Sequence, residues 1–254
     1  MPRPNRPPRT TTVIEREWIT PHMVRIVVGG PELEGFAVGE FTDHYVKLRF
    51  GDTNRTYTVR AFDPEALRLT IDIVVHGDQG LVGPWAATVK PGDELLLNGP
   101  GGGYTPSPNA AWHLLAGDES ALPAIALALE RIPAGRPVFV VLEGDGPEYR
   151  IPLQTPGALQ LNWIDRPSAA GEDPELQLQV IRKLELPQGE GHAFIHGEAE
   201  AVLRIRRHLL QERAMKREQM SATGYWKFSR TDEEWRVEKR DWIATAEADA
   251  DKVS

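Results

Sequence analysis

The chain has 254 residues, 41% of them hydrophobic and none of them cysteine. This length allows one large domain or two ordinary ones, and the absence of cysteine excludes disulfides, thiolate metal sites and a cysteine nucleophile. The net charge of −8 is uneven: residues 31–199 hold 12 Lys or Arg against 24 Asp or Glu, a net of −12, and residues 200–240 hold 11 against seven, a net of +4, which argues against a general nucleic-acid partner.

The amino-terminal residues 1–12 are rich in Pro and Arg and lack the apolar core of a secretory signal. No apolar run approaches the length of a membrane span. These features predict a soluble cytoplasmic protein with no membrane partner.

Residues 1–104 are predicted to form a six-stranded antiparallel Greek-key β-barrel. Short apolar or alternating runs are separated by turns rich in Gly, Pro and Asp, and there is hardly any helical periodicity. The expected strands lie at residues 13–14, 23–28, 44–50, 55–60, 67–75 and 94–97.

Residues 105–254 are predicted to form an α/β, Rossmann-like domain, because a Gly-rich break at residues 99–103 is followed by alternating strands and helices. A last helix should start at a capping box, Thr231 to Glu234, with an apolar stripe through Trp235 and Trp242 and a frayed end from Ala244 onward. The expected strands lie at 113–116, 137–142, 159–164 and 193–195, and the expected helices at 121–131, 172–184 and 199–219, the last with Glu212 and Lys216 in i,i+4 register.

The stretch from Arg55 to Arg60 places a cation, an aromatic ring and a hydroxyl close together on one predicted strand. In an extended chain, Arg55, Tyr57 and Val59 point one way and the residues between them point the other. A flat cofactor that bears phosphate would use such groups for charge, stacking and hydrogen bonding. The alternative is an ordinary hairpin surface.

A strand that ends at His76 is followed by Gly80 and Gly83, which allow backbone N–H groups to approach a ligand closely. Pro84 can begin a short helix, and a helix N-terminus reached through a Gly-rich turn is suited to phosphate. A turn without a ligand is an equally good interpretation of this segment.

Two further turns follow buried strands in the second half, at residues 117–121 and 197–199. Ligands of open α/β sheets collect at the carboxyl ends of strands, so these turns could flank one nucleotide site. The first turn is not a G-x-G-x-x-G fingerprint. Arg204, Arg206 and Arg207 fit a solvated helix face, with a contact to an NADP 2′-phosphate as the lesser alternative.

Taken together, these motifs resemble the siderophore-interacting proteins, which are flavin-dependent ferric-siderophore reductases of the ferredoxin-reductase-like superfamily. The resemblance runs from about Val13 to Trp242 in the family's order. It rests on Arg55-x-Tyr57-Thr58-x-Arg60, Asp72-x-Val74-x-His76-Gly77-x-x-Gly80-x-x-x-x-Trp85, Pro91-Gly92-Asp93, Gly99-Pro100, Gly117-Asp118-Glu119-Ser120-Ala121-Leu122-Pro123-Ala124, Gly197-Glu198-Ala199 and Gly224-Tyr225-Trp226.

The resemblance implies an FAD-binding barrel followed by a domain for NADPH or NADH. Arg55 would meet the FAD pyrophosphate, Tyr57 would lie against the isoalloxazine ring and Thr58 would reach its edge near N5. The family often has a hydroxyl residue where this chain has Gly83. The implied FAD set is Arg55, Tyr57, Thr58, Val59, Asp72, Val74, His76, Gly77, Gly80, Val82, Gly83 and Trp85, and the implied nicotinamide-nucleotide set is Gly117, Asp118, Glu119, Ser120, Gly197, Glu198 and Ala199.

The implied activity is electron transfer from NAD(P)H through FAD to a ferric siderophore, with release of Fe(II), and it needs no acid–base dyad or protein metal ligand. Because ferric catecholates are anionic, a basic pocket is expected. Lys227 and Arg230 are its first candidates and Lys47 and Arg49 are weaker ones, although each could equally be an exposed charge. The alternatives are a flavin reductase for another acceptor and a non-enzymatic siderophore or flavin carrier.

Overall fold

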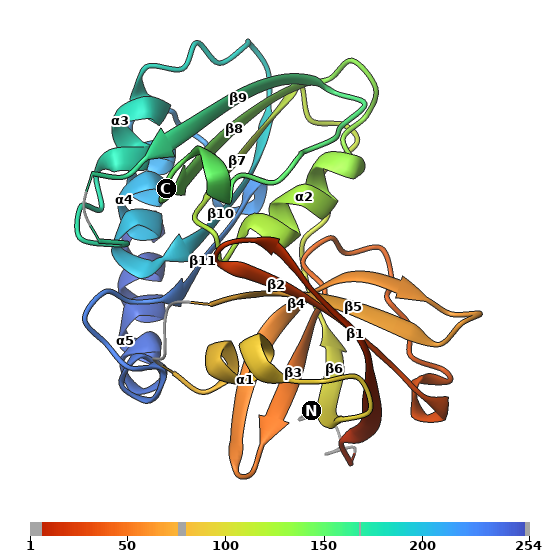
Figure 1. The fold of residues 1–254 in the computed structure, drawn as a ribbon. Coiled ribbons are helices and arrows are strands. Elements are labelled where there is room, and N and C mark those ends of the chain that lie inside the picture. Colours follow the sequence, from red (N-terminus) through yellow and green to blue (C-terminus); the bar gives the residue numbers. More distant parts are fainter. Residues whose placement is uncertain (1–6, 76–79, 168, 252–254) are drawn as a thin grey trace. The chain divides into compact units, whose positions relative to one another are not determined.

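The computed structural model describes residues 7–75, 80–167 and 169–251 of the chain (Figure 1). It divides into two compact units, Met1–Thr105 and Pro106–Ser254. Within the described residues, no helix combines the length and the apolar character needed to cross a membrane.

The first unit is a closed six-stranded antiparallel barrel, which confirms the predicted fold of this half. The strand order β1-β2-β5-β4-β3-β6 is that of a Greek key, because β3, β4 and β5 are successive neighbours while β2 pairs with β5. The strands are β1 (Arg9–Thr20), β2 (Met23–Gly29), β3 (Tyr45–Phe50), β4 (Thr53–Asp63), β5 (Arg68–Val74) and β6 (Glu94–Gly101), with a 3-10 turn at Pro31–Leu33 and a short helix α1 at Val82–Thr88.

Alternation of side chains along the strands fills the barrel interior. Val46 and Leu48 of β3 are fully buried, whereas Lys47 between them is exposed. The same alternation buries Ile71 and Ile73 on β5. A two-residue period in the sequence therefore gives one apolar face per strand, and closure of the sheet brings these faces together.

The second unit is a five-stranded parallel sheet in the order β11-β10-β7-β8-β9, which confirms the predicted α/β fold. Helix α2 covers one face of this sheet, and α3 and α4 cover the other (Figure 1). Every residue of β7 is buried, as expected for a strand that is covered on both faces. The elements are β7 (Trp112–Gly117), α2 (Leu122–Glu130), β8 (Pro137–Gly144), β9 (Ala158–Asp165), α3 (Leu176–Arg182), β10 (Gly191–Glu198), α4 (Ala199–Gln211), β11 (Met220–Trp226) and α5 (Asp232–Asp251), with 3-10 turns at Pro147–Tyr149 and Arg217–Gln219.

The helix predicted over residues 199–219 was too long, because α4 ends at Gln211 and the chain turns to form β11. Ala214 adopts a left-handed backbone, which ends helical continuation, and Met215 is buried. Glu212, the C-cap of α4, contacts His208 in the last turn of the helix, with 3.0 Å between the carboxylate and Nδ1. The predicted i,i+4 pairing with Lys216 is wrong.

Two other helix limits also differ from expectation. Helix α3 begins at Leu176 rather than at 172, because the Asp173 carboxylate accepts the Glu175 N–H at 2.9 Å and forms a turn before the helix. Helix α5 continues to Asp251 instead of fraying from Ala244. Its last turns are held to α4, where Arg207 Nε lies 2.5 Å from the Asp249 carboxylate.

The start of α5 confirms the predicted capping box. The Thr231 N–H donates to the Glu234 carboxylate at 2.8 Å, and the Glu234 N–H donates to the Thr231 hydroxyl at 3.3 Å. The predicted apolar stripe also forms, since the Trp235 and Trp242 rings lie edge to face with centroids 6.0 Å apart. The Trp242 indole N–H donates to the Ala199 carbonyl at 3.0 Å, which ties α5 to the start of α4.

Candidate functional site

Strand β4 carries the cation, ring and hydroxyl that the sequence singled out. Arg55 pairs across the strands with Leu48, and Tyr57 pairs with Val46. Because directly opposed residues share one face of a sheet, Arg55 and Tyr57 lie on the face of the barrel core, and Thr58 lies on the other. Both larger side chains are half-buried, and the Tyr57 ring packs against the core. The Tyr57 ring and the Thr58 hydroxyl thus lie on opposite sides of β4.

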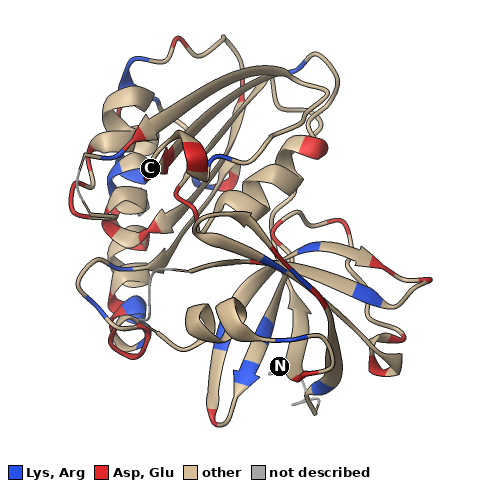
Figure 2. Ribbon diagram, in the orientation of Figure 1, with Lys and Arg blue, Asp and Glu red and all other residues tan. Residues whose placement is uncertain are grey.

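The β3–β4 hairpin is strongly cationic. Residues 45–60 contain four Lys or Arg and one acid, Asp52, and Figure 2 shows these charges along the two strands. Lys47 and Arg49 are exposed on the outer face, where the Arg49 Nε donates to the Gly51 carbonyl at 3.0 Å. The structure therefore places these two cations on the opposite face of the hairpin from Arg55.

Asp72, on the neighbouring strand β5, is buried and bonds to an arginine of the barrel wall. Its side chain is 0% exposed and accepts two bonds from Arg25, at 2.7 Å to Nε and 2.8 Å to Nη2. Arg25 and Asp72 face each other across β2 and β5, and this contact raises the pKa of Arg25. The sequence did not reveal the pair, because its register depends on which strands are neighbours.

The segment after β5 contains six of the predicted FAD residues, among them one histidine and three glycines. His76 and Gly77 lie outside the described residues. Gly80 has a left-handed backbone, with φ of 82°, that favours glycine. Gly83 differs, because a Cβ placed there would come only to 3.6 Å from the Val75 Cα, which is ordinary contact. A side chain therefore fits at Gly83.

The remaining predicted FAD residues are largely apolar parts of the barrel. Val59 and Val82 are 2% and 3% exposed and belong to its core, and Val74 is half-buried at the end of β5. The Trp85 ring meets the Phe50 ring edge to face, with centroids 5.3 Å apart. Val82 and Trp85 belong to α1, and Pro84 lies in its first turn as expected.

In the second unit, Asp118 joins the two turns that the sequence predicted to lie together. Its Oδ1 accepts the Ser120 N–H at 2.9 Å and the Ser120 hydroxyl at 2.5 Å. Its Oδ2 accepts the Glu198 N–H at 2.8 Å and the Trp226 indole N–H at 2.9 Å. Asp118 is 3% exposed. Its carboxylate thus connects the ends of β7, β10 and β11.

Glu198 performs a similar role at the start of α4. Its Oε2 accepts the N–H groups of Glu200 and Ala201 at 2.7 and 2.8 Å, so it is the N-cap, and its Oε1 accepts the Phe228 N–H at 3.2 Å. Burial raises the pKa of Glu198, and the three backbone donors oppose that shift. The preceding Gly197 has φ of 136°, and a Cβ there would lie 2.5 Å from the Asp118 Oδ2.

A buried charge cluster lies beside these turns, at the carboxyl ends of β7, β8 and β9. The Arg166 guanidinium bonds to Glu119 and lies 3.5 Å from the Glu143 carboxylate and 3.3 Å from Asp145. Burial raises the pKa of Glu119 and raises that of Glu143 to about 7, while Arg166 opposes both shifts. The sequence analysis missed Glu143 and Arg166, although both stand at the ends of predicted strands.

The two basic residues that follow β11 share one carboxylate. Glu238 of α5 lies 2.7 Å from the Lys227 ammonium and 2.5 Å from the Arg230 guanidinium. These hydrogen bonds lower the pKa of Glu238. The Lys227 ammonium also lies 6.0 Å from the centroid of the Trp235 ring. Lys227 and Arg230 thus lie on either side of an acid that the sequence analysis did not identify, and their place in a substrate pocket stays a prediction.

Comparison with known proteins gives matches over both units. Residues 12–54 and 52–104 match the model of the siderophore-interacting FAD-binding domain, and residues 110–229 match that of the siderophore-interacting protein. The chain is 38% identical to an uncharacterized protein of Mycobacterium tuberculosis over 96% of this chain and 98% of that one. It is 31% identical to the ferric vibriobactin reductase ViuB of Vibrio cholerae over 91% and 94%. The crystal structure of the siderophore-interacting protein SipS from Aeromonas hydrophila aligns with a TM-score of 0.83 at 29% identity over 94% and 98%.

Proposed function

The chain belongs to the siderophore-interacting protein family, and from that premise we propose that it is an FAD-dependent reductase that uses NADPH or NADH to reduce a ferric siderophore and release Fe(II). The observation that carries the proposal is the cationic β3–β4 hairpin, with Arg55 and Tyr57 half-buried on one strand, inside the unit that matches the FAD-binding model. The likeness to a ferric vibriobactin reductase supports the same reaction class.

The groups along β4 and α1 have the chemistry that FAD requires. Arg55 offers a cation for the pyrophosphate, Tyr57 offers a ring face and Thr58 offers a hydroxyl, while Gly80 leaves backbone N–H groups accessible. The chemistry that bound FAD would supply is to accept a hydride and to pass on electrons one at a time. The contribution of the protein is to bind and orient the flavin.

In the second unit, we assign Asp118 and Glu198 to shaping the nicotinamide-nucleotide site. Both carboxylates are buried and already accept bonds from three or four internal donors, so we assign them to holding the turns at 117–121 and 197–199 instead of accepting bonds from the nucleotide. Gly197 and Ala199 then provide the backbone at the carboxyl end of β10, which is where open sheets bind nucleotides.

Electron transfer through the protein can be followed directly under anaerobic conditions. Purified protein should be yellow, NADPH or NADH should bleach the flavin, and a ferric siderophore should restore its colour while an Fe(II) chelator reports released iron. Protein that takes up no FAD would refute the reductase. Bleaching without reoxidation by any ferric siderophore would instead indicate a flavin reductase for another acceptor.

We expect Tyr57→Ala to weaken FAD binding about tenfold, because it removes a ring worth about 1 kcal/mol in stacking as well as its contact area. Tyr57→Phe retains the ring and should remain within about threefold of the wild type. Tyr57 also packs on the barrel core, so FAD titration is paired with urea unfolding of the apoprotein. A Tyr57→Ala variant that is folded and binds FAD normally would remove Tyr57 from the flavin site.

Gly83→Ser should tighten FAD binding about threefold, because it adds a hydroxyl at the first turn of α1, where there is room for a Cβ. Gly83→Ala is the matched control, since alanine in place of a helical glycine stabilises the helix by about 1 kcal/mol and adds no donor. Fluorescence titration of both apoproteins separates the two effects. Equal affinities for the Ser and Ala variants would contradict a contact at this position.

Glu238→Gln should lower the KM for an anionic ferric chelate about threefold, because it removes the carboxylate that competes for Lys227 and Arg230. The FAD content and the KM for an uncharged ferric chelate should not change. Glu233→Gln, an exposed change of the same charge on α5, is the control. If the two variants behave alike, only net charge matters and the pair does not bind the substrate.

A further inference from the structure

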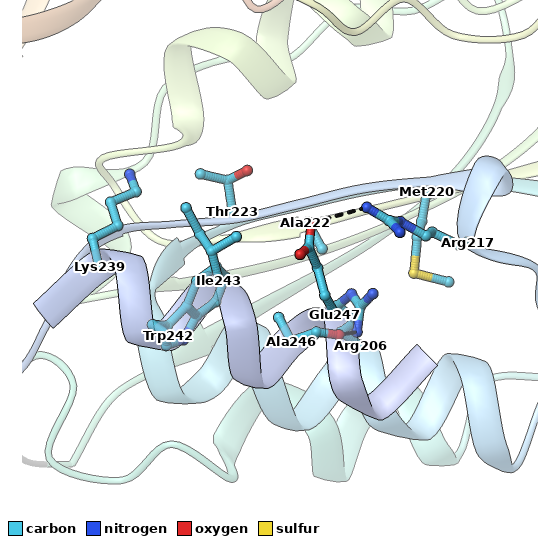
Figure 3. A pocket seen from close by; sticks show the side chains of 10 residues that line it. All are labelled: Arg206, Arg217, Met220, Ala222, Thr223, Lys239, Trp242, Ile243, Ala246 and Glu247. Atoms are coloured by element: carbon cyan, nitrogen blue, oxygen red, sulfur yellow. Dashed lines mark hydrogen bonds and ion pairs between the residues drawn. The ribbon is translucent and has the colours of Figure 1, made fainter. Parts of the chain in front are cut away.

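A cavity of about 270 Å³ lies within the second unit between β11, α4 and α5 (Figure 3). One face of α5 forms its wall, because positions 239, 242, 243, 246 and 247 recur on the same side of a helix. The 3-10 turn at Arg217–Gln219 and the first residues of β11 close the other side. The carboxyl end of β11, where Trp226 bonds to Asp118, is not part of its lining, so the cavity is distinct from the candidate nucleotide site.

The cavity combines an apolar middle with cationic ends. Trp242 and Ile243 lie along it, with Lys239 at one end and Arg206 and Arg217 at the other (Figure 3). Lys239 and Glu247 are eight residues apart on α5, which corresponds to about 12 Å along a helix. The cavity is therefore long enough for a ring that bears an acidic substituent.

Positive charge in the lining exceeds negative charge by two, since Lys239, Arg206 and Arg217 face a single acid, Glu247. Glu247 is already engaged, at 3.2 Å from the Arg217 guanidinium. In the part of the chain that the structure describes, neither Arg206 nor Lys239 forms an ion pair.

Arg206 was predicted to belong to a solvated helix face, but it is only 5% exposed. Its guanidinium donates to the Ala246 carbonyl, which is neutral. Burial and the neighbouring Arg217 lower the pKa of Arg206, and burial also lowers that of Lys239. The Asp249 and Glu247 carboxylates oppose the shift in the pKa of Arg206 only in part, because Asp249 pairs with Arg207 and Glu247 pairs with Arg217. An anion bound beside Arg206 would offset the remaining cost of burying this cation.

We propose that this cavity binds a small organic anion, in which an aromatic or aliphatic body contacts Trp242 and Ile243 and an acidic group contacts the cations. An engineered cavity of about 150 Å³ holds benzene, so the larger volume here accommodates a ring with a carboxylate or a phosphate attached. This site does not depend on the flavin reaction.

Calorimetry on the FAD-saturated protein tests the site with four probes: phenyl phosphate, benzoate, inorganic phosphate and benzyl alcohol. We expect one equivalent of phenyl phosphate or benzoate to bind, and the other two probes to bind at least tenfold more weakly. Absence of heat with both aromatic anions at millimolar concentration overturns the proposal. Benzyl alcohol that binds as tightly as benzoate overturns the requirement for an anion.

Two pairs of variants locate the binding. Lys239→Gln should weaken it about tenfold, whereas Arg240→Gln, the same charge change on an exposed neighbour, should not. Ile243→Glu places a carboxylate in the cavity and should abolish binding. The fold tolerates this change because Ile243 is 44% exposed. Ala244→Glu, also exposed, is its control. Binding that Lys239→Gln and Ile243→Glu leave unchanged lies elsewhere and overturns the assignment.

Discussion

Arg166→Met lowers the free energy of unfolding by about 3–5 kcal/mol at pH 8, because removal of one partner from a buried ion pair leaves its carboxylates uncompensated. Three acids depend on this guanidinium: Glu119, Glu143 and Asp145. The Arg166 side chain is 1% exposed, so water cannot replace it. Methionine fills a similar volume, which limits the contribution of an empty cavity.

The loss of unfolding free energy in Arg166→Met should be smaller at pH 5 than at pH 8. The direction of this pH dependence follows from the pKa of Glu143. Its pKa is about 7 in the folded protein and near 4.5 in the unfolded chain, so the folded state binds the extra proton between these values. Stability that is present below pH 4.5 is therefore lost as the pH rises to 7. Without Arg166 the folded-state pKa of Glu143 rises further, and the decline extends to higher pH.

Urea unfolding monitored by tryptophan fluorescence from pH 5 to pH 8 measures the loss of unfolding free energy and its dependence on pH. Arg150→Met is the matched control, because Arg150 pairs with Asp165 at 2.5 Å at the surface and such pairs contribute about 0–1 kcal/mol. Glu143→Gln should flatten the decline between pH 4.5 and 7 in the otherwise unchanged protein. An Arg166→Met loss that is equal at pH 5 and pH 8 would show that packing, not charge, explains it.

Both folds could be predicted from the sequence, because each depends on a short-range pattern of apolar residues. Alternation over two residues marks the barrel strands, as at Val46 and Leu48, and unbroken apolar runs mark parallel strands such as β7. Strand β11 was missed because Met220–Trp226 has neither pattern, and the left-handed residue Ala214 that ends the preceding helical segment leaves no signal in the sequence.

The polar networks could not be predicted, because their members are distant along the chain. Arg25 bonds to Asp72 47 residues away, and Asp118 bonds to Trp226 108 residues away. The sequence located Asp118 correctly at a turn after a buried strand, but it gave no information on which donors would reach the carboxylate. A polar residue at a ligand-binding edge can equally build the edge, and only the structure distinguishes these roles.

Asp118→Asn tests that distinction and should cost about 2–4 kcal/mol of stability, because charged hydrogen bonds are worth about 1.5–3 kcal/mol and buried donors would be left unpaired. Each Asp118 oxygen accepts two bonds, so either orientation of the asparagine amide places its NH₂ group against two donors. Ser120→Ala removes only the hydroxyl bond to the same carboxylate and should cost about 1 kcal/mol.

The kinetic consequence separates a residue that positions the site from one that contacts the nucleotide. If Asp118 holds the turns, Asp118→Asn raises the KM for NADPH and NADH alike, leaves FAD content unchanged and increases exchange of the Trp226 indole proton with solvent. A direct contact would instead raise KM while the indole proton stayed protected and stability stayed normal. Since the carboxylate is 3% exposed and already accepts four bonds, we expect the first result.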